Sequence, residues 1–313
     1  MINYKKCIFC NSSLFKIVHE FSAPPAGETR YSYLDGKPYY RRIKKCTTCS
    51  HFFAEHDFVN QNLYSGEYLK SVYGDLDGIS ERFSKVMNLS EDSSDNRGRV
   101  KFINSFFREF RGLNEFGNRS GKSADMDCCI NVEDGVRRII SEYSNSYEKN
   151  VSDEKMSVLD VGSGTGVFPF LMKESGWNVT ASDPDGIACR HLTEKLQIKS
   201  VQGKFEELKL NNSFDLITFN KVIEHVIDPV GFLDKTSDLL DVRGGWLYIE
   251  VPDGEMASKC GYSRQEFFID HFHVFSMASV ALLANKHSFD LEKIERLREP
   301  SGKFTIRAFF KRK

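Results

Sequence analysis

Three glycines at alternate positions, Gly162, Gly164 and Gly166, form the most informative chemical pattern of this sequence. They follow the apolar run VLDV, in which Asp160 lies near the end, and they precede the helical pattern VFPFLMKES. A strand, a glycine turn and a helix bring a nucleotide-like cofactor against bare backbone, because glycine has no Cβ to hold the ligand away. We therefore predict that this turn, including Ser163, binds a cofactor.

The spacing of the glycines separates two classes of cofactor. A dinucleotide fingerprint would need its third glycine at position 167, which is Val167. An NAD-dependent oxidoreductase is therefore disfavoured. The observed pattern resembles motif I of the class I S-adenosylmethionine (SAM) methyltransferases. This resemblance implies an α/β fold with a Rossmann-like sheet of seven strands, the last of them antiparallel.

Further landmarks follow in the order that the resemblance requires. The second predicted strand ends at Asp183, before Pro184, and an acid there can accept both ribose hydroxyls of an adenosine. The fourth predicted strand leads to Asn220 and is followed by Glu224 and His225. The predicted strands cover residues 158–161, 177–183, 201–206, 214–219, 244–253, 289–298 and 303–311.

Each part of SAM has a predicted partner in this arrangement. The helix N-terminus after Gly166 would receive the methionine carboxylate, and Asp160 would take the methionine ammonium directly or through water. Asp183 would hold the ribose, and the backbone amide of Phe205 would face the adenine. The cofactor-binding residues that we predict are Asp160, Gly162, Ser163, Gly164, Gly166, Asp183, Pro184, Phe205 and Asn220.

Two Cys-x-x-Cys pairs lie in the N-terminal part of the chain. Each pair can place two thiolates on one tight turn, and two facing turns make a tetrahedral zinc site. The predicted ligands of this structural zinc ion are Cys7, Cys10, Cys46 and Cys49. A redox-active dithiol is the alternative, and His51 and His56 are alternative ligands.

A four-cysteine zinc module ahead of a methyltransferase domain resembles the sugar C-methyltransferases of tylosin-type and tetronitrose-type deoxysugar pathways. It also resembles methyltransferases encoded in bacterial surface-polysaccharide clusters. We accordingly expect a small zinc-knuckle module over 1–62, linking helices within 63–150 and the methyltransferase domain over 151–313. Helices are expected over 63–74, 93–110 and 134–149, with a flexible insertion near 111–134.

The candidate catalytic residues lie in two segments. Residues 265–276, QEFFIDHFHVFS, resemble the sugar C-methyltransferase segment YHEHFSYFS, which places Asp270 and His271 on its acid and histidine. Phe268 stands where that segment has a tyrosine. Removal of a proton beside a ketone needs a base, and imidazole titrates near neutral pH, so His271 is the first candidate. Asp270 would orient His271 or contact sugar hydroxyls.

His225, beside Glu224, is the second candidate base. Both residues follow the fourth predicted strand, at the edge of the sheet where ligands bind in folds of this class. Alternative roles for them are a helix cap or a contact with the methionine moiety of SAM.

The composition excludes several classes of protein. The 313 residues contain 43 Lys and Arg against 44 Asp and Glu, which gives no basic footprint for nucleic acid. No run approaches the 18 or so apolar residues of a membrane span, and the N-terminus has no apolar stretch of signal-peptide length. Eight cysteines in such a chain favour metal binding or free thiols over disulfides. We expect a soluble, cytoplasmic protein.

The sequence therefore predicts a SAM-dependent methyltransferase with a small-molecule acceptor. The resemblance favours a nucleotide-linked sugar or glycan precursor that is methylated on carbon through an enolate. An O- or N-methyltransferase acting on a sugar or another small molecule is the close alternative. A zinc-ribbon interaction protein with an inert Rossmann-like domain is the alternative from a different class.

Overall fold

The computed structural model describes residues 4–29, 31, 36, 38–56, 74–119, 155–286 and 289–313. The chain divides into two compact units, one formed by Met1–Asp95 with Met156–Lys313 and the other by Asn96–Lys155. The helices expected over 63–74 (except Gly74) and 134–149, and the expected insertion beyond residue 119, lie outside the described residues.

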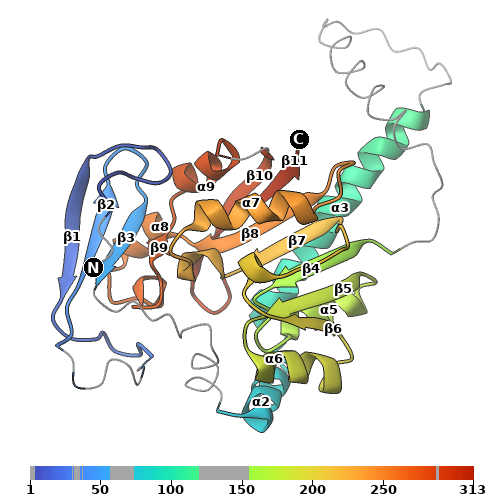
Figure 1. The fold of residues 1–313 in the computed structure, drawn as a ribbon, viewed down its shortest axis with the longest axis horizontal. Coiled ribbons are helices and arrows are strands. Elements are labelled where there is room, and N and C mark those ends of the chain that lie inside the picture. Colours follow the sequence, from blue (N-terminus) through green and yellow to red (C-terminus); the bar gives the residue numbers. More distant parts are fainter. Residues whose placement is uncertain are drawn as a thin grey trace, which may run out of the picture. The chain divides into compact units, whose positions relative to one another are not determined.

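A seven-stranded mixed sheet is the centre of the first unit (Figure 1). Its order is β10-β11-β8-β7-β4-β5-β6, in which the neighbours from β8 to β6 are parallel and β11 runs antiparallel to both β8 and β10. This confirms the predicted Rossmann-like sheet. The strands are β4 (Ser157–Val161), β5 (Asn178–Asp183), β6 (Lys199–Gln202), β7 (Leu216–Asn220), β8 (Trp246–Pro252), β10 (Phe289–Arg298) and β11 (Phe304–Arg312).

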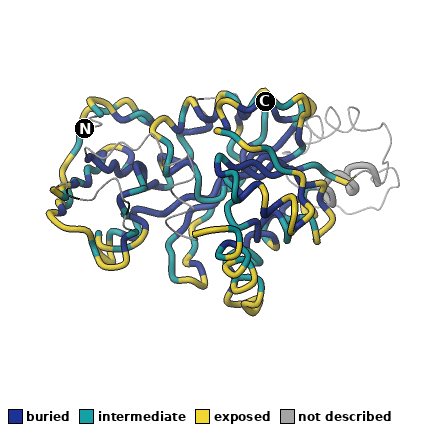
Figure 2. The backbone as a smooth tube through the Cα atoms, turned by 60° about the horizontal axis from the view of Figure 1, so that its bottom comes forward, coloured by how far each residue is buried: buried dark blue, intermediate teal, exposed yellow. Residues whose placement is uncertain are grey.

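The central strands are buried almost throughout, and Figure 2 shows them in the buried colour. Parallel sheets that are covered on both faces have near-continuous apolar strands, as β4, β7 and β8 do here. Leu159 and Leu247 are fully buried, and each such side chain contributes about 1.5–3 kcal/mol of transfer free energy. The position of the strand ends is therefore strongly determined by the core.

Three helices each come after a strand of this sheet. They are α5 (Val167–Glu174) after β4, α6 (Gly186–Arg190) after β5 and α7 (Pro229–Leu239) after β7. The carboxylate of Asp185 accepts hydrogen bonds from the amides of Ile187 and Ala188 and so caps α6. Asp228 caps α7 in the same way, with Pro229 at the first helical position. A π-helical turn (His191–Lys195) extends α6 toward β6.

A second, four-stranded sheet contains residues from both ends of the chain. Its order is β1-β2-β3-β9, and all its pairs are antiparallel. The strands are β1 (Phe15–Phe21), β2 (Arg41–Cys46), β3 (Phe52–His56) and β9 (His273–Val274). The expected N-terminal module therefore shares its sheet with the segment that carries His271.

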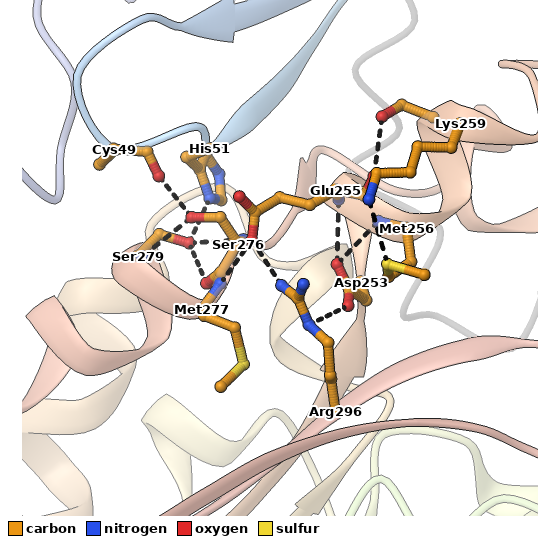
Figure 3. Close-up of polar contacts among 11 residues, drawn as sticks. Cys49, His51, Asp253, Glu255, Met256, Lys259, Ser276, Met277, Ser279 and Arg296 are labelled. Atoms are coloured by element: carbon orange, nitrogen blue, oxygen red, sulfur yellow. Dashed lines mark hydrogen bonds and ion pairs between the residues drawn. The ribbon is translucent and has the colours of Figure 1, made fainter.

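Side chains reinforce this junction next to α8 (Gly254–Lys259) and α9 (Met277–Ala284), as Figure 3 shows. Ser276 caps α9 and donates a hydrogen bond to the carbonyl of Cys49. His51 Nδ1 is hydrogen bonded to Ser279 Oγ at 3.0 Å. Arg296 pairs with Asp253, the cap of α8, at 3.0 Å. The second cysteine turn is thus held against the start of α9.

Two helices precede the large sheet in sequence. α2 (Leu76–Met87) begins at Asp75, whose carboxylate accepts a hydrogen bond of 3.0 Å from the amide of Gly78. α3 runs from Asp95 to Arg119, so the helix expected over 93–110 continues into the start of the segment expected to be an insertion. Among the described residues, we find no helix long and apolar enough to cross a bilayer.

Candidate functional site

The glycine turn after β4 has a left-handed backbone at all three glycines, with φ of +72° at Gly162, +51° at Gly164 and +80° at Gly166. A Cβ on Gly162 would lie 2.7 Å from Val222, and one on Gly166 would lie 2.6 Å from Leu196. A Cβ on Gly164 would meet only the carbonyl of Gly162, at 4.0 Å. The turn is therefore packed beneath its outer glycines and open at Gly164, where a ligand can approach.

Asp183 lies beside this turn at the end of β5. One of its carboxylate oxygens accepts a hydrogen bond from the amide of Gly164 and the other from the amide of Asp185, both at 2.9 Å. Burial raises the pKa of Asp183 to about 6, although these amides favour the ionised form. Pro184 follows, and its carbonyl accepts a hydrogen bond of 3.5 Å from Gln202.

Asp160 is linked across the sheet to β7. Its Oδ1 accepts hydrogen bonds from Thr218 Oγ1 at 2.7 Å and from Asn220 Nδ2 at 2.9 Å. Its carbonyl accepts one from Ser163 Oγ at 3.0 Å. The Oδ1 of Asn220 is buried and has no hydrogen-bond partner among the described residues. Asp160 therefore orients Asn220, whose carbonyl oxygen can accept a hydrogen bond from an ammonium group.

Thr218 is a residue that the sequence analysis missed. It lies two positions before Asn220 on β7, so its side chain belongs to the same face of the strand. The two-residue spacing from Asn220 is the sequence signal that could have identified Thr218.

Phe205 lies in a short 3₁₀ helix (Phe205–Glu207) beyond β6. Its side chain is buried and packs against Phe219 and Phe232, with ring centroids 5.4 and 4.8 Å away. The aromatic ring therefore belongs to the core, and a contact with adenine could involve only its backbone.

The four predicted catalytic residues come together from two segments. Glu224 and His225 lie in a 3₁₀ turn after β7, and Asp270 and His271 follow a 3₁₀ turn over Gln265–Phe267. The His225 and His271 rings have centroids 4.7 Å apart. The structure thus places the two candidate bases side by side.

Backbone carbonyls determine the tautomers of both rings. Nδ1 of His225 donates to the carbonyl of Asp270, and Nδ1 of His271 donates to the carbonyl of Glu266, each at 2.8 Å. A carbonyl can only accept, so the hydrogen of each neutral ring is assigned to Nδ1 and the lone pair to Nε2. Both rings are therefore in the form in which Nε2 can accept a proton or bind a cation.

Glu224 completes this cluster. It is fully buried, and both of its carboxylate oxygens lack a hydrogen-bond partner among the described residues. One ligand atom each from Glu224, His225 and His271 lies within 4.8 Å of the others. A buried carboxylate needs a compensating charge or donor, so the cluster can hold a shared proton, an acceptor hydroxyl or a divalent cation.

Burial and the neighbouring charges shift the pKa values of His271 and Asp270 in opposite directions. Burial lowers the pKa of His271, and the neighbouring Asp270 raises it in part. Burial alone would raise the pKa of Asp270, but His271 and His225 favour its ionised form, and its pKa lies below the usual value. Asp270 therefore stays ionised near neutral pH.

Residues of the N-terminal sheet and its loops contact the same segment. The Glu28 carboxylate accepts a hydrogen bond from the amide of Ile269 at 2.8 Å, and Arg41 donates to the carbonyl of Phe267. Glu28 and Arg41 form a buried ion pair of 3.1 Å. Tyr31 donates a hydrogen bond of 3.3 Å to Asp270. No local spacing indicates these contacts, because they join residues more than two hundred positions apart.

The four N-terminal cysteines gather at one point. The Sγ–Sγ distance is 3.5 Å both for Cys7 with Cys49 and for Cys10 with Cys46, and all four sulfurs lie within 4.8 Å of one another. Zinc–sulfur bonds of about 2.3 Å in a tetrahedron give sulfur–sulfur edges of about 3.8 Å. A hydrogen bond from the Cys49 thiol lowers the pKa of Cys7. The set fits a four-thiolate metal site.

The two histidines considered as alternative ligands have other contacts. His51 is hydrogen bonded to His273 at 3.1 Å and to Ser279. His56 stacks on Phe272, with ring centroids 5.4 Å apart.

Sequence comparisons relate the chain to known methyltransferases. A family model described as a methyltransferase domain matches residues 132–294. The ubiquinone biosynthesis O-methyltransferase of Rickettsia canadensis is 31% identical over 123 residues, 37% of this chain and 49% of that protein. The enzyme of the same name from Haemophilus ducreyi is 36% identical over 98 residues, 28% of this chain and 42% of that protein. The chain thus spans about half the length of these curated relatives.

Two solved structures match part of the chain at low sequence identity. The N-methyltransferase NodS from Bradyrhizobium japonicum, in complex with S-adenosylhomocysteine, is 14% identical, with a TM-score of 0.40 over 58% of this chain and 89% of that one. The 1,6-didemethyltoxoflavin-N1-methyltransferase of Burkholderia thailandensis is 17% identical, with a TM-score of 0.42 over 60% of this chain and 93% of that one.

Proposed function

Because the chain belongs to the family of methyltransferase domains, we propose that it transfers a methyl group from S-adenosylmethionine to a small-molecule acceptor. One observation carries this proposal: the glycine turn and the histidine cluster adjoin at the carboxyl edge of the sheet. Val222, which packs on Gly162, lies directly before the 3₁₀ turn that holds Glu224 and His225. A cofactor on the turn and an acceptor at the cluster would therefore be neighbours.

SAM would supply the methyl group, and the residues around the turn would hold it. The open face at Gly164 and the N-terminus of α5 suit the methionine carboxylate. The unpartnered oxygen of Asn220 suits the methionine ammonium. Asp183 would accept the ribose hydroxyls. Catalysis would then consist mainly of positioning, which can lower a barrier by about 7–11 kcal/mol.

The cluster of imidazoles supports an acceptor that must lose a proton. Nε2 of His271 would first accept this proton, and the acceptor atom would then bond to the methyl carbon while the methyl–sulfur bond breaks with its electron pair left on sulfur. Together with the resemblance of residues 265–276, this supports methylation on a carbon beside a ketone, through an enolate. The proposed acceptor is an activated, nucleotide-linked sugar or a related glycan precursor.

O-methylation is the second candidate. It is favoured by the names of the curated relatives, which are ubiquinone biosynthesis O-methyltransferases. The same imidazole would then remove a hydroxyl proton, so the cluster serves either reaction.

We also propose that the four cysteines bind a structural zinc ion. The sulfur geometry supports this, and the turn residues that follow each pair, Asn11 and Ser50, have φ near +60° as tight turns require. The zinc would stabilise the N-terminal sheet.

A methyl-transfer assay tests the proposed function. The full chain is incubated with SAM and a panel of nucleotide-linked keto-sugars and hydroxy-sugars. The masses of the products are then measured by mass spectrometry. We expect a gain of one methyl group on a keto-sugar, and hydrogen–deuterium exchange at the adjacent carbon that His271→Ala abolishes. A methylated hydroxy-sugar would favour the second candidate, whereas no SAM binding by calorimetry would contradict both.

A further inference from the structure

Tyr31 is far from the candidate site in sequence but contacts it in the structure. We propose that Tyr31 is a positioning residue for methyl transfer: its hydroxyl holds the carboxylate of Asp270, which in turn orients His225. The kinetic consequence rests on the proposed function, whereas the structural consequence can be measured without an acceptor.

The contact between Tyr31 and Asp270 is partly buried. The Tyr31 side chain is 2% exposed, and its hydroxyl donates a hydrogen bond of 3.3 Å to Oδ2 of Asp270. The Asp270 side chain is 12% exposed. Buried phenols need a hydrogen-bond partner, and a bond to an ionised carboxylate is stronger than one between neutral groups. Tyr31 therefore restricts the rotation of the Asp270 carboxylate.

Asp270 faces His225 with two groups. Its carbonyl accepts the Nδ1 hydrogen of His225 at 2.8 Å, and its carboxylate lies 3.8 Å from the same nitrogen. A carboxylate at this place keeps the hydrogen on Nδ1 and the lone pair on Nε2, as the acid does in hydrolase triads. The phenol, the carboxylate and the imidazole thus form a chain, in which Tyr31 acts through Asp270.

The hydroxyl that contacts Asp270 comes from Tyr31, which lies far from it in the sequence. At position 268, the resembled segment has a tyrosine and this chain has Phe268. The amide of Ile269 and the carbonyl of Phe267, on either side of it, are held by Glu28 and Arg41. The N-terminal residues therefore hold the backbone of this segment, and Tyr31 brings a hydroxyl to Asp270.

The pKa of Asp270 depends on the charged and titratable groups that face it. They are His225, His271, Tyr31, Glu28 and Arg41. The hydrogen bond from Tyr31 is one of the contributions that lower the pKa of Asp270. Removal of the hydroxyl should therefore raise that pKa, while the other four groups remain in place.

The test compares Tyr31→Phe with a matched control, Tyr39→Phe. Tyr39 also donates to a buried carboxylate in this region, that of Glu28 at 2.6 Å. Carboxyl-carbon and histidine-nitrogen NMR follow Asp270 and His225 in the full, zinc-loaded chain. We expect Tyr31→Phe to raise the titration midpoint of Asp270 and to mix the tautomers of His225. Tyr39→Phe should do neither.

Kinetics with a double-mutant cycle give the second readout. We expect Tyr31→Phe to lower kcat by about ten- to a hundredfold with little change in KM for SAM. Added to Asp270→Asn, it should have almost no further effect, because the two residues act as one unit.

Two results would overturn the inference: an unchanged Asp270 titration in Tyr31→Phe, or effects on kcat that multiply in the double variant. If the NMR changes appear but no acceptor is methylated, the positioning role holds and the proposed function fails.

Discussion

The amide of Gly164 donates a hydrogen bond of 2.9 Å to the carboxylate of Asp183. This bond ties the open glycine of the turn to the acid that ends the neighbouring strand, β5. Two positions that the sequence marks for different parts of one cofactor are thus joined by a direct hydrogen bond. The relationship gives the site a pH dependence that can be measured.

We predict that the affinity for SAM falls as the pH drops below about 6. The ribose hydroxyls would donate to ionised Asp183, and burial raises the pKa of this group to about 6. Protonation removes the acceptor, so affinity should decrease about tenfold for each further pH unit. Calorimetry between pH 5 and 8 checks this. Asp183→Asn should bind weakly at every pH, and an unchanged pH dependence in that variant would contradict the assignment.

Gly164→Val should abolish detectable SAM binding, with a loss of affinity of about a hundredfold or more, equivalent to about 2.8 kcal/mol. Its side chain would enter the open face of the turn, where the ligand is expected. A left-handed backbone at a non-glycine residue also costs about 1–2 kcal/mol. Gly176→Val is the control, because Gly176 has φ of +99° and equally open surroundings but lies away from the turn.

Both valine variants should lose similar thermal stability, and only the first should lose SAM binding. Near-normal affinity in Gly164→Val would show that the cofactor does not use this turn.

Cys46→Ser should lose zinc and lower the melting temperature of the chain. Three thiolates cannot complete the tetrahedral site, and each kcal/mol lost corresponds to about 2–4 °C in a chain of comparable size. Metal analysis of the purified protein checks this, with Cys260→Ser as control because Cys260 is exposed. A wild-type protein without zinc under chelator-free conditions would refute the site.

The sequence predicted the large sheet well where a strand is a compact apolar run between breaks, as Trp246–Pro252 is. Phe289–Arg298 lies at the edge of the sheet, and six of its ten residues are charged. Helix length was harder to predict: α3 continues to Arg119 although residues 111–119 are polar and unpatterned. Gly112 and Gly117 are poor helix formers, so neither helix propensity nor the hydrophobic pattern predicts this extension.

Contacts between distant segments could not be predicted from the sequence. The pairing of Phe52 with Val274 places two apolar residues opposite one another, but many other pairs would satisfy the same pattern. The bond from Tyr31 to Asp270 likewise depends on the pairing of β3 with β9, which brings a late segment of the chain to the N-terminal sheet. Sequence spacing places Glu224 with His225 and Asp270 with His271, whereas their common location follows only from the fold.

Transfer of a carbon-labelled methyl group from SAM to a nucleotide-linked keto-sugar tests the central claim most directly. NMR of the product locates the label, and His271→Ala is measured beside the wild type under the same conditions. The account predicts a carbon-bound methyl group in the wild-type product and a rate at least about a hundredfold lower in the variant. A wild-type reaction that forms neither labelled product nor S-adenosylhomocysteine with any sugar tested would contradict the account.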